Sequence, residues 1–172
     1  MSLPRGIRNN NPGNIRQNNI QWQGVSENPF DPHFVEFKEP IWGVRALMKT
    51  LLTYYRRYGL DTVQSIVNRW APPHENATDH YVFHVARRLN VRRFDALDVE
   101  DPSILMGLAR AIIVHENGFP SKKFVENDIK NWPKDWYEDA LYLQAVRMAI
   151  GKQTKQQFGF ETKAQRRQFL TA

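Results

Sequence analysis

Glu116 is the residue whose position in the chain points most directly to proton-transfer chemistry. Leu108, Ile112 and Glu116 recur at spacings of four, so they share one face of a predicted helix, and that face should be buried. Asp101 is a suitable N-cap and Gly118 a suitable stop, which places Glu116 in the last turn. Burial and the negative end of the helix dipole both disfavour a charged carboxylate there. An uncharged carboxylic acid can serve as a general acid. In the alternative interpretation the helix end is frayed, and the Glu116 carboxylate reaches water.

Two further carboxylates compete for a chemical role. Glu36 alternates with Val35 and Phe37 in a predicted strand, so its side chain projects from the opposite face. A strand carboxylate across a cleft from a helix-end glutamate is a pair that glycosidases use, although a solvent-facing strand residue is the simpler interpretation. Glu75 lies just before a predicted helix, whose dipole stabilises a negative charge, and this favours a binding or orienting role.

The histidines and the absence of cysteine argue against other kinds of site. His80 and His84 are one helical turn apart with Asp79 and Glu75 nearby, but the order differs from His-Glu-x-x-His and no third ligand follows by spacing. The chain has no cysteine, which excludes disulfides and thiolate ligands. It also has no nucleophile elbow and no Walker loop. We therefore expect neither a metal nor another cofactor.

The hydrophobic pattern that must position these residues changes at Pro40. Before it, the sequence is rich in Asn, Gln, Pro and Gly, and short alternating runs predict strands at residues 14–17, 20–23 and 34–37. After it, helical periodicity takes over. We expect a mostly α (α+β) fold with a small antiparallel β element near the N-terminus, in which residues 152–172 form a basic C-terminal helix or tail of the same domain as residues 1–151. The predicted helices cover residues 41–58, 63–70, 76–89 (capped by Asn76), 102–117 and 133–151.

Composition favours an anionic partner and no membrane span. The formal net charge is +6 and the sequence pI is near 9.7, so nucleic acid, an anionic cell wall or a membrane surface could attract the protein. Paired basic residues usually lie on the solvent-exposed face of a helix, and no nucleic-acid-binding motif accompanies them here. Nucleic acid is therefore the weakest of these candidate partners. No apolar run approaches the ~20 residues that span a bilayer. The N-terminus has no apolar signal core, so we expect no export signal there and leave the localisation and oligomeric state open.

Three motifs together resemble a family of peptidoglycan-cleaving proteins with a lysozyme-like fold, frequent in phage particles and bacterial effectors. They are residues 5–15 (RGIRNNNPGNI), 70–78 (WAPPHENAT) and 111–118 (AIIVHENG). Lytic transglycosylases and goose-type lysozymes carry a similar glutamate-ending helix, a Gly-containing β segment and an Asn-bearing loop. Here the glutamate helix comes last rather than first, which a circular permutation would reconcile.

The resemblance implies cleavage of the β-1,4 bond between N-acetylmuramic acid and N-acetylglucosamine, by a transglycosylase or a muramidase acting on the cell wall from the periplasm or a phage particle. A non-catalytic wall-binding or virion structural module with the same fold is the alternative, and nucleic-acid binding is a third, weaker one. Residues with expected roles are Glu116 and Glu36 as catalytic carboxylates, and Asn14, Glu75, Asn76 and Tyr81 as substrate-binding side chains.

Overall fold

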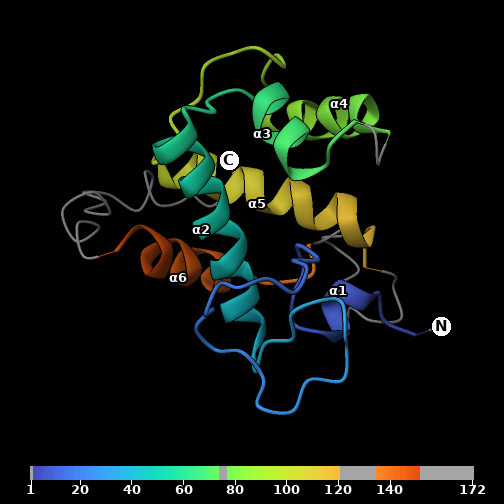
Figure 1. Cartoon of the computed structure of the whole chain (residues 1–172). Helices are drawn as coiled ribbons and strands as arrows, with labels where there is room; N and C mark the ends of the chain where they lie inside the picture. Colours follow the sequence, from blue (N-terminus) through green and yellow to red (C-terminus); the bar gives the residue numbers. More distant parts are fainter. Residues whose placement is uncertain (1, 74–76, 121–134, 152–172) are drawn as a thin grey trace.

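The structure of this chain is a computed structural model that describes residues 2–73, 77–120 and 135–151. Over these residues the chain is mostly α-helical, as predicted, and no segments pair into a continuous β-ladder. Figure 1 shows the long helix α2 crossing the middle of the molecule, with the N-terminal segment gathered around its first turns and α5 crossing it. The helices in the described part are α1 (Arg5–Arg8), α2 (Pro40–Tyr58), α3 (Val63–Trp70), α4 (Thr78–Leu89), α5 (Pro102–Asn117) and α6 (Asp139–Ile150).

The helix ends follow local signals in the sequence. Pro40 opens α2 and Gly59 closes it in the left-handed conformation. Thr62 caps α3 through a capping box in which its side chain accepts from the Ser65 backbone N–H. The Asp101 carboxylate accepts from the first turn of α5. These caps fix where each helix begins, and through α5 they fix where Glu116 lies.

The main core lies where α2 packs against α5 and α6, with α3 and α4 closing one side. Leu47 and Leu51 of α2, Ile112 of α5 and Tyr142 of α6 are fully buried there. Burying a side chain of this size contributes roughly 1.5–3 kcal/mol. The whole length of α5 up to Val114 is therefore anchored, and the last turn of α5 has a rigid base.

A smaller apolar cluster holds the N-terminal segment, and here the strand prediction was wrong. Instead of a ladder there are two isolated antiparallel bridges, Arg16 to Phe34 and Val25 to Phe37, and residues 20–23 take part in neither. The physical reason is Asn11, whose buried side-chain amide donates 2.9 Å to the Ile15 carbonyl and 2.8 Å to the Val35 carbonyl. The Val35 N–H still donates to the Ile15 carbonyl, but the Asn11 side chain sits in place of the reciprocal bond, since the Ile15 N–H donates to Asn11 Oδ1 at 2.9 Å. The alternating residues still bury their apolar side inside the cluster of Ile15, Val35, Phe37 and Ala46.

Two other boundaries differ from the predictions. Helix α4 begins at Thr78 with Ala77 in the N-cap position, and Asn76, the predicted cap, lies outside the described residues. Helix α6 begins at Asp139, later than predicted, and it buries Tyr142, Ala145, Val146 and Ala149. The predicted tail at residues 152–172 lies outside the described residues. Among the described helices, none combines the length and apolar run that a bilayer span requires.

Candidate functional site

The Glu116 carboxylate lies in the last turn of α5, where three side chains from other parts of the fold donate hydrogen bonds to it. The Asn14 amide donates to Oε2 at 3.1 Å, while the Tyr81 hydroxyl and the Trp70 indole N–H donate to Oε1 at 2.9 and 3.4 Å. Glu116 is partly exposed, so its helix face reaches a surface rather than the core. Three donors on two oxygens hold the carboxylate in one orientation.

Each donor comes from a different element. Asn14 follows α1 in a tight loop and adopts a positive φ of 50°, which asparagine tolerates better than most residues. Trp70 is the last residue of α3, and its ring packs against Gly13 of the same loop. Tyr81 lies in α4 and is only 3% exposed. The site therefore forms where the N-terminal loop, α3, α4 and α5 meet.

A stack of rings supports the Tyr81 hydroxyl from behind. The Tyr81 and His115 rings are parallel to within 11° with centroids 3.6 Å apart, and His115 Nδ1 lies 3.1 Å from His84 Nδ1. One of these imidazoles must donate and the other accept. Burial lowers the pKa of both histidines, and burial together with the Glu116 charge raises the pKa of Tyr81 well above its usual range. Tyr81 therefore remains a hydroxyl donor at physiological pH.

Asn117 ties the end of α5 to the N-terminal loop. Its side-chain amide donates to the Pro12 carbonyl at 2.7 Å and to the Ile113 carbonyl at 2.9 Å. A Cβ on Gly6 would lie 2.5 Å from Asn117 Oδ1 and 3.0 Å from Asn14 Oδ1, so glycine allows this close approach. The loop that carries Asn14 is thus fixed to the helix that carries Glu116.

Glu116 opens onto a cleft of about 950 Å³. Lys49, Thr50 and Tyr54 of α2 line one wall, and the N-terminal segment also lines the cleft, with Trp22 among other side chains. Four basic side chains line the cleft (Arg5, Arg16, Lys49 and Arg69), and Glu116 is the one acidic side chain among its described lining residues. The space is large enough for a sizeable ligand, and the surrounding charge favours an anionic one.

Not all of the residues singled out from the sequence gather at this cleft. Asn14 and Glu116 are hydrogen-bonded to each other, as we expected from the resemblance of their motifs. Glu75 and Asn76 lie outside the described residues. Glu36 instead accepts hydrogen bonds from the backbone N–H groups of Phe30 and Asp31, at 2.8 and 2.5 Å. Its carboxylate holds a turn of the N-terminal segment and does not line the cleft.

Tyr81 also differs from its sequence-based interpretation. Tyr81 is covered by His115 and faces Glu116, so its ring presents no surface to a sugar. The described residues hold no group of three His, Asp or Glu side chains suited to a metal ion. His84 turns toward His115 of α5. Sequence reasoning missed His115 and the Trp70 N–H as partners of the site, although each belongs to a motif that it did single out.

Comparison with known proteins gives one clear relative. The chain is 40% identical over 130 residues to Protein P5 of Pseudoalteromonas phage PM2, a match that covers 73% of this chain and 78% of that protein. No family model matches the chain.

Proposed function

The chain belongs to the family of Protein P5 of Pseudoalteromonas phage PM2, and from this premise we propose that it cleaves the glycan strands of peptidoglycan. The bond cut is the β-1,4 linkage between N-acetylmuramic acid and N-acetylglucosamine. The observation that carries the proposal is the Glu116 carboxylate, which three uncharged donors orient at one large cleft. A single oriented carboxyl group at a cleft, in its protonated form, is what protonation of a glycosidic oxygen requires.

The meeting of the three motifs at one point supports the lysozyme-like resemblance. Asn14 belongs to the first motif, Trp70 to the second and Glu116 to the third, and both of the first two donate to the carboxylate of the third. Motifs that are distant in sequence but adjacent in space favour one shared chemical task. We therefore propose that this chain carries the three motifs of the lysozyme-like proteins in a permuted order along the sequence.

In the proposed reaction, Glu116 protonates the glycosidic oxygen as its bond to C1 of the muramic acid breaks. The N-acetylglucosamine-bearing fragment leaves as an alcohol, and positive charge develops on the muramic acid ring. The Glu116 carboxylate then removes the proton from the C6 hydroxyl of that ring, and the hydroxyl oxygen bonds to C1 to close a 1,6-anhydro ring. Asn14, Trp70 and Tyr81 act as positioning residues, because they hold the carboxylate toward the bond.

The presence of a single carboxylate among the described residues that line the cleft favours a transglycosylase over a hydrolase. A hydrolase needs a second group to place and activate a water molecule, and this is commonly a second carboxylate. Glu116 is the only carboxylate among the described residues that line the cleft, and Glu36 is engaged by backbone N–H groups elsewhere. An internal hydroxyl of the substrate removes the need for that second group. We assign Glu36 no step in the reaction.

Mass spectrometry of soluble fragments from purified peptidoglycan tests the function. We expect muropeptides ending in 1,6-anhydro-N-acetylmuramic acid. Fragments with a reducing muramic acid end would show that the same bond is cleaved by hydrolysis, so that the protein is a muramidase and not a transglycosylase. Protein that sediments with peptidoglycan and releases no fragment would overturn the proposal in favour of a non-catalytic wall-binding module.

A further inference from the structure

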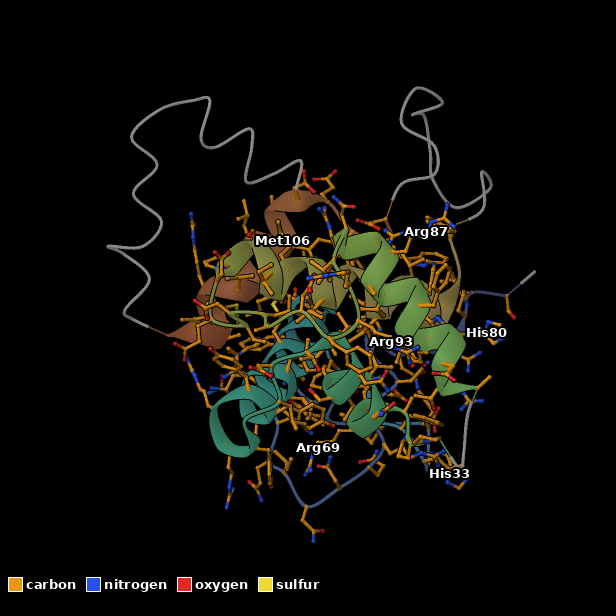
Figure 2. The ribbon with its side chains drawn as sticks, turned by 90° about the horizontal axis from the view of Figure 1, so that it is seen from above. His33, Arg69, His80, Arg87, Arg93 and Met106 are labelled. Atoms are coloured by element: carbon orange, nitrogen blue, oxygen red, sulfur yellow. The ribbon has the colours of Figure 1, made fainter. Side chains whose placement is uncertain are left out.

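Arg69 presents a supported guanidinium at the cleft. It precedes Trp70 in the last turn of α3, and its guanidinium carbon lies 3.9 Å from the centre of the Tyr58 ring and 5.2 Å from that of Tyr54. The two tyrosines are one turn apart on α2, so together they form a flat support for the cation. Figure 2 shows Arg69 at the edge of the molecule, well apart from Arg87 on α4. The guanidinium is thus exposed and still held in place.

The cations of the cleft form no ion pair with a carboxylate in the described part of the chain, in contrast to several cations elsewhere. Arg56, Arg88 and Arg110 each form an ion pair with a carboxylate on another part of the surface. Within the cleft, Arg5 and Arg16 lie over the Phe34 ring, and neither they nor Arg69 and Lys49 form an ion pair with a described carboxylate. A ligand that enters this cleft without negative charge of its own would desolvate these cations with no compensating charge.

Lys49 extends the same positive wall along α2. Burial and the charges of Arg45 and Arg56 lower the pKa of Lys49, as expected for an ammonium group with no carboxylate beside it. Lys49, Thr53 and Tyr54 all line the cleft from α2, and Lys49, whose Nζ donates to the Ala149 carbonyl at 3.4 Å, adds one positive charge to this wall. The polar wall therefore offers more than one contact to a charged chain.

A guanidinium recognises a carboxylate by two parallel N–H···O bonds, and it recognises a neutral sugar much less strongly. A peptidoglycan strand offers carboxylates from two sources, the lactyl group of unsubstituted muramic acid and the peptides attached to that group. Glu116 is partly buried whereas Arg69 is exposed, so a group that projects away from the sugar chain suits Arg69 better.

We propose that Arg69, in a cleft that Lys49 also lines, binds a carboxylate of the peptide attached to the glycan, so that the protein prefers peptide-bearing strands. This inference rests on the proposed function of the cleft. The cleft would then contain a recognition site for the peptide beside the site of cleavage. Arg69 determines substrate specificity and takes no part in the chemical step.

The test uses three soluble substrates: oligomers of N-acetylglucosamine, glycan strands stripped of peptide by an amidase, and peptide-bearing strands. For the wild type we expect kcat/KM to be at least 10-fold higher on peptide-bearing than on stripped strands, with the neutral oligomer the poorest. Arg69→Gln should lower kcat/KM at least 10-fold on peptide-bearing strands and by a much smaller factor on stripped strands, so that the preference for peptide-bearing strands is lost. Arg92→Gln removes the same charge from an exposed ion pair outside the cleft and should change neither.

Two outcomes would overturn the assignment. Equal wild-type rates on stripped and peptide-bearing strands, both slowed by Arg69→Gln, would assign the carboxylate to the lactyl group. An Arg69→Gln variant with wild-type rates on all substrates would remove Arg69 from recognition.

If the wild type cleaves none of the strands, the proposed function fails, and binding still tests the inference. Quenching of tryptophan fluorescence reports that binding, because Trp22 and Trp70 line the cleft. Tighter binding of peptide-bearing than of stripped strands, lost in Arg69→Gln, would support peptide recognition without cleavage. Equal affinities would overturn it.

Discussion

Asn14 and Glu116 stand 102 residues apart in the chain, and the Asn14 side-chain amide donates a hydrogen bond of 3.1 Å to the Glu116 carboxylate. The neighbouring bond from Asn117 to the Pro12 carbonyl repeats the connection one residue along α5. The N-terminal loop and the end of α5 are therefore joined at two adjacent points. This junction, more than α5 alone, determines the direction in which the carboxylate points.

Replacing Asn14 by glycine should lower the rate of peptidoglycan cleavage by roughly 10- to 100-fold, because a misplaced catalytic group is costly even when the displacement is small. Glycine retains the positive φ of 50°, so the loop itself should persist. Asn90→Gly makes the same exchange at a φ of 55° after α4, away from the cleft, and should leave the rate unchanged. Equal rates for Asn14→Gly and the wild type would show that the amide does not position Glu116.

Replacing Tyr81 by phenylalanine removes one donor and preserves the ring that stacks on His115. We expect the cleavage rate to fall on the order of 10-fold, since Trp70 still donates to the same carboxylate oxygen. Tyr137→Phe is the matched control because its buried hydroxyl has no hydrogen-bond partner among the described residues. That variant should retain full activity and unfold at the same or a higher temperature. A Tyr81→Phe protein with an unchanged rate would contradict the positioning role.

Two glycines inside helices should respond in opposite ways to alanine. A Cβ on Gly43 of α2 would lie 1.9 Å from the Asn10 carbonyl oxygen, so Gly43→Ala should force the N-terminal loop away and cost about 1–3 kcal/mol. A Cβ on Gly107 of α5 would have ordinary contact with Leu89, so Gly107→Ala should stabilise the helix by roughly 0.5–1 kcal/mol. Urea unfolding of the two variants measures both signs. A destabilised Gly107→Ala or a neutral Gly43→Ala would show that these packing distances are wrong.

The pair of His84 and His115 should make the protein less stable in mild acid. Burial lowers the pKa of each histidine in the folded state, with help from Arg88 and Arg87 at His84 and from the facing imidazole at His115, where Glu116 opposes the shift. As the pH falls through the ordinary value near 6.5, the unfolded chain gains protons that the folded chain does not, so the free energy of unfolding decreases. The decrease ends below the folded-state pKa values, where both states are protonated.

Thermal unfolding between pH 7.5 and 5.5 checks this dependence. The wild-type Tm should fall with pH in this window, and His84→Asn should fall less steeply because one of the two titrating groups is gone. Equal slopes for the two proteins would exclude the pair as the source of the pH dependence.

Helix positions could be predicted from the sequence wherever the signal is local. Pro40 and Gly59 mark the ends of α2, and Asp101 and Gly118 mark those of α5, since caps and left-handed stops depend on a few neighbouring residues. The placement of Glu116 in the last turn of α5 followed from the same reasoning and is confirmed.

The N-terminal segment and the surroundings of Glu116 depend on contacts between distant residues, which periodicity does not encode. Alternation around Val35 predicted a strand, but the Val35 carbonyl accepts from the Asn11 side chain instead of from the backbone of a strand partner, and only an isolated bridge forms. Tyr81 was interpreted as a sugar-stacking aromatic, because nothing in its helix pattern shows that its hydroxyl meets Glu116. The contact between Asn14 and Glu116 was predictable only through the resemblance of the motifs.

Glu116→Gln tests the assignment of the proton donor, and Glu36→Gln tests the competing carboxylate. Glutamine matches the size of glutamic acid and cannot deliver a proton in the same way. Its amide nitrogen can also be accommodated, because Asn14 Oδ1 is buried without a partner and can accept from it if the Asn14 amide turns over. Glu36→Gln retains an oxygen for the N–H groups of Phe30 and Asp31 and should remain active.

The most direct measurement is therefore the release of soluble muropeptides from purified peptidoglycan by wild type and Glu116→Gln, made together with their thermal unfolding. We expect Glu116→Gln to release fragments at least ~10²-fold more slowly, as loss of general acid catalysis implies, and to unfold at nearly the wild-type temperature. A folded Glu116→Gln protein that releases fragments at the wild-type rate would show that Glu116 is not the proton donor.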